Sequence, residues 1–221
     1  MYREIETGLR LSCGPSQQTF VASFRIFIAV VLFMTLSFLA VALKFQTAVF
    51  FRLPATVRTA LSVLHAGIVV ANVSLYGLLC AIDYNRLDLP PALRVAGGVM
   101  AFTGIYLILA GILTLRAALF FPESDGRLVT GRLYLLVRNP MYLGGITGSL
   151  GIALAVASLY ALYYTGIFAI VLYTVSRLEE RDLARRFGRE FETYRRQVPR
   201  LMPTPASISA FARSFRREAQ R

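Results

Sequence analysis

Two short groups of polar residues flank one long apolar stretch and contain the side chains best suited to chemistry. The first is Arg138-Asn139-Pro140-Met141-Tyr142, and the second is Arg177-Leu178-Glu179-Glu180. The second group places two adjacent carboxylates where the apolar stretch ends, and carboxylates can bind cations or accept protons. If the apolar stretch folds into a hairpin, the two groups lie at the same end of it.

The first group also has a purely structural interpretation. Asn139 is a favoured N-cap, and Pro140 suits the first helical position because its missing N–H would be unpaired there. Arg138 is typical of a cytoplasmic flank and Tyr142 of the headgroup level. The residues by themselves leave both interpretations open.

An apolar stripe follows the second group. Leu183, Phe187, Phe191, Tyr194 and Val198 recur at helical spacing, which predicts one amphipathic helix. Its opposite face carries Arg181, Arg185, Arg186, Arg189, Arg195 and Arg196. Such a helix is expected to lie in the headgroup plane with its apolar side towards lipid. The alternative is a basic anchor without a chemical role.

Long apolar stretches supply the elements that would position these groups. A membrane-spanning helix needs about 20 apolar residues, and the stretches near 20–43, 57–82 and 93–121 each provide them. Residues 141–176 are enough for two short helices, with the turn at Ala157-Ser158. The sequence therefore predicts an all-α integral membrane protein with about five transmembrane helices, the last two forming a tight hairpin, plus a C-terminal amphipathic interfacial helix.

The charge distribution predicts which side each loop occupies. The chain has 24 Lys and Arg against 12 Asp and Glu, a net charge of +12, and 56% hydrophobic residues. Such a basic excess fits anionic headgroups better than nucleic acid, which is not expected as a partner. With five spans, the first loop, the third loop and the tail share one side and hold most of the basic residues. The positive-inside rule then places the N-terminus outside and the C-terminus in the cytoplasm. The use of Arg rather than Lys suggests a bacterial inner membrane.

Taken in order, the two groups and the stripe resemble the isoprenylcysteine carboxyl methyltransferase family and its relatives, the small membrane phospholipid N-methyltransferases. The shared pattern is Arg-His-Pro or Arg-Asn-Pro with Tyr-x-Gly, a hairpin, Glu-Glu, and a series that ends in Val-Pro-Arg. The matching residues are Arg138, Asn139, Pro140, Tyr142, Gly144, Glu179, Glu180, Leu183, Phe187, Gly188, Phe191, Tyr194, Val198, Pro199 and Arg200. The resemblance covers residues 128–203.

The resemblance implies that S-adenosylmethionine binds at the cytoplasmic membrane face and that an amphiphilic or lipid-like acceptor enters from the bilayer. Arg138, Glu179 and Glu180 are the implied catalytic residues. The implied cofactor-binding residues are Tyr134, Arg138, Asn139, Tyr142, Leu143, Gly144, Glu179, Glu180, Tyr194 and Arg200. Arg138 would pair with the cofactor carboxylate. Catalysis would depend mainly on positioning and on the exclusion of water.

Three departures from the family pattern bear on mechanism. The family's histidine is Asn139, which cannot act as a general base near neutral pH. Its second tyrosine is Phe191, and of a Gly-Pro-Tyr-Arg run only Tyr134 remains. A carboxylate acceptor needs no base, whereas an amine acceptor must lose a proton. Glu179 or Glu180 would then be the nearest base.

Two polar residues within the predicted spans are candidate substrate-binding residues. An ionisable group in a span is a functional candidate by default, and His65 and Arg116 are such groups. The alternatives are a hydrogen bond to a neighbouring helix for His65 and snorkelling to headgroups for Arg116. No metal site is expected, because His65 is the only histidine and Cys13 and Cys80 lack ligand spacing.

The chain divides accordingly into three regions. Residues 1–127 hold the N-terminal helices, 128–203 form a methyltransferase-like region with the hairpin 141–176, and 204–221 form a basic amphipathic tail. The expected function is methylation of a lipid-like acceptor, either O-methylation of an isoprenylcysteine-type carboxylate or N-methylation of a phospholipid ethanolamine. A non-enzymatic transporter or assembly factor is the alternative from another class. A transporter would favour repeats and midplane charges, whereas these spans show no repeat and few midplane charges.

Overall fold

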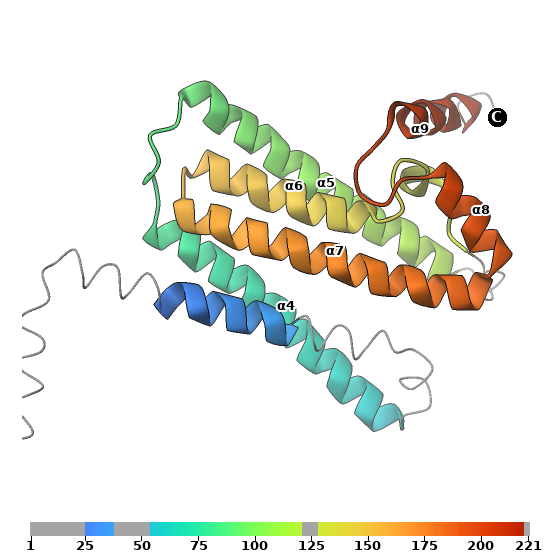
Figure 1. The fold of residues 1–221 in the computed structure, drawn as a ribbon, viewed down its shortest axis with the longest axis horizontal. Coiled ribbons are helices and arrows are strands. Elements are labelled where there is room, and N and C mark those ends of the chain that lie inside the picture. Colours follow the sequence, from blue (N-terminus) through green and yellow to red (C-terminus); the bar gives the residue numbers. More distant parts are fainter. Residues whose placement is uncertain (1–24, 38–53, 121–127, 219–221) are drawn as a thin grey trace, which may run out of the picture.

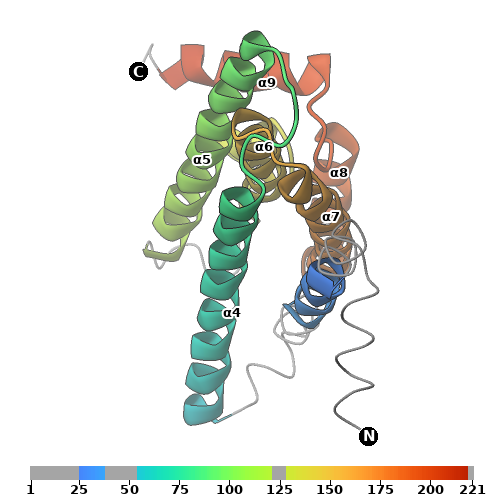
Figure 2. The same cartoon turned by 90° about the vertical axis from the view of Figure 1, so that its left-hand side faces the viewer.

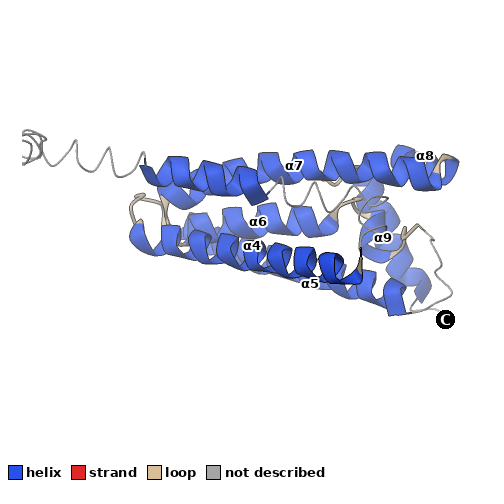
Figure 3. Ribbon diagram, turned by 90° about the horizontal axis from the view of Figure 1, so that it is seen from below, coloured by secondary structure: helices blue, strands red, loops and turns tan. Residues whose placement is uncertain are grey.

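The computed structural model describes residues 25–37, 54–120 and 128–218, without the side chains of Arg58 and of residues 115–120 and 215–218. This part of the chain is helical and contains no strand (Figure 3). A helix Arg25–Ser37 comes first. The following elements are α4 (Ala55–Ile82), α5 (Pro91–Phe120), the 3₁₀ turn η2 (Arg132–Leu135), α6 (Pro140–Ala155), α7 (Leu159–Phe187), α8 (Arg189–Gln197) and α9 (Pro205–Glu218).

Among the described residues, three helices are long and apolar enough to cross a membrane. They are α4, the segment Pro91–Thr114 of α5, and α7, and the shorter apolar helices are Arg25–Ser37 and α6. The predicted span 57–82 is therefore confirmed as a helix, and so is the span 93–121 as far as residue 120, where the described segment ends. Of the predicted span 20–43, only Arg25–Ser37 lies within the described residues. The all-α membrane fold is confirmed.

The predicted hairpin is also confirmed, with its turn where the sequence placed it. α6 ends at Ala155 and α7 begins at Leu159, and Ala157 has φ of 53° in the turn. Ser158 is the N-cap of α7, and its hydroxyl accepts a hydrogen bond from the Ala161 N–H. This bond satisfies one of the unpaired donors of the first turn.

The prediction of a single amphipathic helix after the hairpin is wrong. α7 continues past the end of its apolar part to Phe187, and Gly188 (φ 49°) separates it from α8. The left-handed conformation favours glycine and ends the helix. The stripe is thus divided between α7, which carries Leu183 and Phe187, and the α8 segment.

The apolar side of this stripe packs inside the protein, which differs from the predicted contact with lipid. Phe191, Tyr194 and Val198 are buried and pack against Leu128, Tyr134, Leu183, Ala184 and Phe187. The segment 128–134 therefore covers the side of α8 that the sequence alone left open. Burial of such a cluster stabilises the folded state by removing apolar area from water.

Close packing between α5 and α6 holds the bundle together. A Cβ on Gly104 would overlap the backbone of Gly148, and a Cβ on Gly97 would lie 2.7 Å from the Gly151 carbonyl oxygen. Small residues allow membrane helices to approach this closely. Gly144 and Gly148, four residues apart, form the small-residue signal that the sequence contained for this contact.

The helices form a layered arrangement with α9 across one end. α5, α6 and α7 run side by side, whereas α4 diverges from them towards its N-terminus (Figure 1). The helix Arg25–Ser37 packs on α4 and α7 through Val30 and Met34, which contact Leu79 and Tyr164. α9 crosses the direction of the bundle, as the view turned by 90° shows (Figure 2). The C-terminal segment therefore gathers at the end where α6 begins and α7 finishes.

Candidate functional site

Glu180 is the centre of a buried ion-pair cluster. Its carboxylate is 5% exposed and accepts two hydrogen bonds from each of two arginines. Arg138 donates through Nε and Nη2 at 3.0 and 3.2 Å, and Arg200 donates through Nε and Nη2 at 2.9 and 2.6 Å. Bidentate pairs of this kind are the strongest charge-assisted hydrogen bonds in proteins. The cluster joins residues from three separate segments of the chain.

Arg138 is fully engaged by the protein. Its Nη1 donates to the carbonyl oxygen of Arg195 at 2.8 Å and to that of Val198, and its side chain is 9% exposed. Its backbone N–H also donates to the Pro199 carbonyl oxygen at 2.9 Å. Arg138 thus ties the start of α6 to the end of α8.

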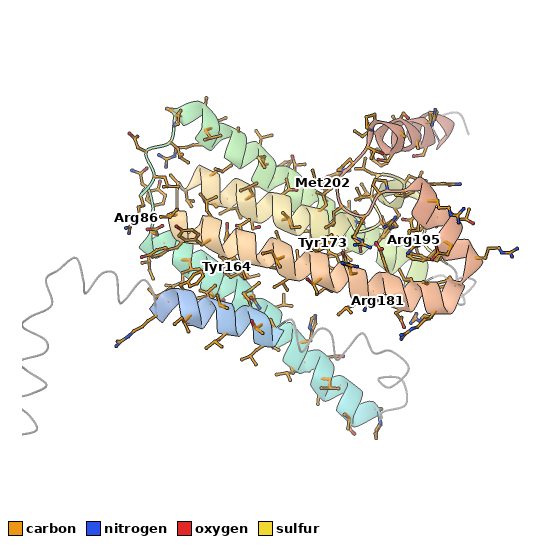
Figure 4. The ribbon with its side chains drawn as sticks, viewed as in Figure 1. Arg86, Tyr164, Tyr173, Arg181, Arg195 and Met202 are labelled. Atoms are coloured by element: carbon orange, nitrogen blue, oxygen red, sulfur yellow. The ribbon has the colours of Figure 1, made fainter. Side chains whose placement is uncertain are left out.

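Arg200 is the more accessible of the two arginines. Its side chain is 25% exposed, and its guanidinium carbon lies 5.4 Å from the centre of the Tyr173 ring. Cations favour this position over an aromatic face. The hydrogen bonds with Glu180 raise the pKa of Arg200 further, so this side chain remains cationic. Figure 4 labels Tyr173 near the middle of α7 and Arg195 further towards the C-terminal end of that helix.

Glu179 differs from its neighbour in having no arginine partner within the described residues. The Tyr142 hydroxyl donates to Glu179 Oε1 at 2.7 Å, and this is the carboxylate's sole hydrogen bond in that part of the chain. The side chain of Glu179 is partly buried. A carboxylate removed from water normally pairs with a cation or several donors. Glu179 therefore has unused capacity to bind a cationic group or a donor.

Tyr134 and Tyr194 pack against each other beside the Glu179 and Glu180 carboxylates. The Tyr194 hydroxyl donates to the Tyr134 carbonyl oxygen at 2.7 Å, and its ring packs edge-on against Phe191. Burial, with a smaller contribution from the charge of Glu179, raises the pKa of the Tyr134 phenol, so the phenol stays neutral. Burial likewise raises the pKa of Tyr194.

Of the remaining predicted cofactor-binding residues, some contact the Glu180 cluster and others do not. Asn139 reaches the cluster, since its Nδ2 lies 3.4 Å from Glu180 Oε1 and its backbone N–H donates to the Arg200 carbonyl oxygen at 3.2 Å. Leu143 follows in the first turn of α6 and is partly buried. Gly144 faces α5, because a Cβ there would lie 2.7 Å from the Gly104 carbonyl oxygen.

His65, one of the two predicted substrate-binding residues, is not part of this cluster. His65 is partly buried on α4, the helix that packs on α7 through Asn72, Leu75 and Leu79 rather than at the Glu180 end. Arg116 lies on α5, but its side chain is outside the described residues. Their proposed roles stay predictions.

Sequence reasoning missed Tyr173 and the carbonyl groups that fix Arg138. Tyr173 lies seven residues before Glu180, and this spacing places both on one face of a helix. That periodicity could have identified Tyr173. The carbonyl oxygens of Arg195 and Val198 carry no side-chain signal, so only the folded chain reveals them. In the described part of the chain, no group of three or more possible metal ligands occurs.

Comparison with known proteins agrees with this geometry. Residues 91–190 match the family model described as phospholipid methyltransferase. A segment of 118 residues is 32% identical to methanethiol S-methyltransferase 1 of Bradyrhizobium diazoefficiens, covering 51% of this chain and 41% of that relative. The match thus spans less than half of the relative's length. No solved structure matches the chain significantly. The two matches support a membrane methyltransferase family for this part of the chain and confirm the resemblance seen in the sequence.

Proposed function

We propose that the protein is an S-adenosylmethionine-dependent methyltransferase that acts on an apolar or amphiphilic acceptor at the membrane surface. The observation that carries this proposal is the convergence of the Arg138, Glu179-Glu180 and Arg200 segments at one end of the α6–α7 hairpin. The family match over residues 91–190 ends within this region. The positive charge of the surrounding loops supports a cytoplasmic position for it.

The polar groups of this region fit the charges of the proposed cofactor. S-adenosylmethionine supplies an electrophilic methyl group on a sulfonium, and it also carries a carboxylate and an ammonium group. Arg200 offers a partly exposed cation for the carboxylate, and Glu179 offers a carboxylate without an arginine partner among the described residues for the positive end. Tyr134 and Tyr142 border Glu179 and limit its contact with water.

Arg138 takes a different role from the one that the resemblance implied. Because Nε, Nη1 and Nη2 all donate to protein oxygens, the guanidinium has little capacity left for a ligand. We assign Arg138 and Glu180 to positioning, since together they hold the C-terminal segment over the hairpin. We assign ligand contact to Arg200 and Glu179.

Calorimetric titration of the detergent-solubilised protein with S-adenosylhomocysteine tests the cofactor part of the proposal. We expect binding by the wild type and at least tenfold weaker binding by Arg200→Ala, because a charge-assisted hydrogen bond is lost. Arg196→Ala is the matched control, since Arg196 is an exposed arginine on α8. Absence of binding by folded wild type would contradict the proposal.

A small thiol is a second candidate acceptor. The matched relative is described as acting on methanethiol, whereas the family model is described by phospholipid acceptors. Transfer of a labelled methyl group to alkanethiols and to extracted membrane lipids, measured in parallel, distinguishes the two. Label in neither fraction would contradict both candidates.

A further inference from the structure

The exposed face of α7 changes from apolar to cationic along the helix. Ile170 is 69% exposed and Tyr173 is 46% exposed, so the rest of the described chain leaves much of both side chains uncovered. From the next turn onward, the exposed residues include Arg177, Arg181 and Arg185. Figure 4 labels Tyr173 and Arg181 along this helix. The three arginines, the α7 arginine column, recur every four residues, which brings them to one side of the helix at steps of about 6 Å.

The column differs from neighbouring arginines in having no acidic partner within the part of the chain that the structure describes. Arg186 pairs with Asp182 at 3.1 Å on the same helix, and Arg195 pairs with Glu192 at 2.9 Å on α8. The ion pairs among the described residues include no member of the column. A group outside these residues must therefore balance its charge.

We propose that the α7 arginine column binds the phosphates of anionic phospholipids in the leaflet where this end of α7 lies. A phospholipid has acyl chains at one end and a phosphate at the other, and the exposed face of α7 has the same order. Arginine binds phosphate oxygens through paired, charge-assisted hydrogen bonds. Three uncompensated cations favour a lipid with a net negative charge, because the cationic group of a zwitterionic lipid cancels part of the attraction.

The apolar part of the same face favours a lipid over a soluble anion. Ile170 precedes Arg177 by seven residues, which is about 10 Å along the helix axis. The acyl chains of a lipid whose phosphate lies at Arg177 therefore reach Ile170. Tyr173 lies between them, and tyrosine is enriched at the boundary between hydrocarbon and headgroups. A soluble anion would use the arginines only and leave this apolar surface without a role.

Lipids bound at the column would fix how deeply α7 is inserted in the bilayer. Glu179 and Glu180 lie between Arg177 and Arg181 in the sequence, so they stand at the same height along the axis, but they are less exposed than these arginines. The column therefore keeps the two carboxylates level with the lipid phosphates and out of the hydrocarbon. This inference goes beyond the proposed methyl transfer and does not depend on it.

The test uses Ile170→Trp as a fluorescent reporter, because the chain contains no tryptophan. The variant is reconstituted in phosphatidylcholine bilayers with increasing fractions of dibrominated phosphatidylglycerol or dibrominated phosphatidylcholine, whose bromines quench indole fluorescence on contact. Comparing the two quenching curves gives the association constant of the anionic lipid relative to the zwitterionic lipid on this face. We expect a preference of about fivefold for phosphatidylglycerol at low salt, the factor that one basic side chain near a membrane surface contributes.

Replacement of the column removes the charges to which the preference is assigned. In the Ile170→Trp background, combining Arg177→Gln, Arg181→Gln and Arg185→Gln should make the two brominated lipids equal quenchers. Arg186→Gln is the matched control, since it removes a cation from the same helix that is already in an ion pair, and it should keep the preference. Salt at about 1 M should also abolish the preference of the Ile170→Trp protein, because the screening length falls to about 3 Å.

Three results overturn the inference. These are equal quenching by the two lipids at low salt, a preference that survives the triple substitution, and an equal loss in the Arg186→Gln control. Circular dichroism checks the helix content of each variant. If the triple variant has lost its helices, the salt titration decides, and a preference unchanged at about 1 M salt contradicts the proposal. None of these results bears on methyl transfer, which the binding of S-adenosylhomocysteine tests separately.

Discussion

A buried carboxylate lies near each end of α7, Asp83 from the C-cap of α4 and Glu180 from α7 itself, and the two charges are balanced differently. At the N-terminal end, Asp83 is 4% exposed and accepts hydrogen bonds from the Ser158 hydroxyl at 3.2 Å and the Tyr160 N–H at 2.9 Å. At the C-terminal end, Glu180 accepts bidentate hydrogen bonds from Arg138 and Arg200. Figure 4 labels Arg86 near the first end and Arg195 near the second.

The difference lies in the donors. Asp83 caps a helix with neutral donors, and its nearest cation, Arg86, is 3.4 Å away with a side chain that is 58% exposed. Glu180 brings together two cations that would otherwise repel each other. A second acid, Glu179, stands beside Glu180. At the first end the carboxylate caps a helix, whereas at the second a carboxylate paired with two arginines stands beside one that accepts a single hydrogen bond from Tyr142.

The largest expected effect is the loss of the charge of Glu180. Glu180→Gln leaves the buried guanidinium of Arg138 and the partly exposed guanidinium of Arg200 without a counter-charge, which should reduce the free energy of unfolding by about 3–5 kcal/mol. Helix content followed by circular dichroism during denaturation in detergent measures the change. Glu179→Gln is the matched control and should change stability by less than about 1 kcal/mol, since it replaces a single neutral hydrogen bond. Equal losses in the two variants would remove the distinction between them.

The close contact of Gly104 on α5 with the backbone of α6 should give the next largest effect on stability. Gly104→Ala places a methyl group against the backbone of α6, and overpacking of this kind costs about 1–3 kcal/mol. Gly98→Ala is the control, because its Cβ would meet no atom within 4 Å. Thermal denaturation in the same detergent measures both. A stable Gly104→Ala protein would show that the two helices can separate without loss.

A smaller effect on stability is expected from the hydrogen bonds that Asp83 accepts at the N-terminal end of α7. Asp83→Asn keeps an oxygen that can accept from Ser158 or from the Tyr160 N–H, so we expect a loss of only about 1 kcal/mol. The exposed Asp88→Asn provides the baseline. A loss as large as that of Glu180→Gln would contradict the view that neutral donors balance Asp83.

The smallest effect is expected for the exposed cation at that end. Arg86→Ala removes an ion pair with Asp83 and a contact with the Tyr160 ring at 5.7 Å. Ion pairs of exposed side chains contribute about 0.2–1 kcal/mol, so the change should fall near the lower limit. Raising the salt concentration should reduce the difference between Arg86→Ala and wild type further.

The amino-acid sequence by itself determined the helices and the end of the hairpin at which its two polar groups meet. Apolar runs of membrane-spanning length placed α4, α5 and the α6–α7 hairpin, because hydrocarbon requires every backbone group to be bonded within a helix. The turn at Ala157-Ser158 was predicted correctly. The two polar groups that flank the hairpin were expected at one end of it, and Arg138 and Glu180 do meet there. The order of these motifs along the chain was sufficient for that.

Only the tertiary structure decided what each member does. Sequence treats Glu179 and Glu180 as equivalent, but on a helix successive side chains point about 100° apart. One therefore faces Arg138 and Arg200, and the other faces Tyr142. The same holds for the α8 stripe, since no local pattern shows that residues 128–134 cover it. Contacts between segments far apart in the chain fix the charge balance, and they distinguish the carboxylate paired with two arginines from the one that accepts a single hydrogen bond from a phenol.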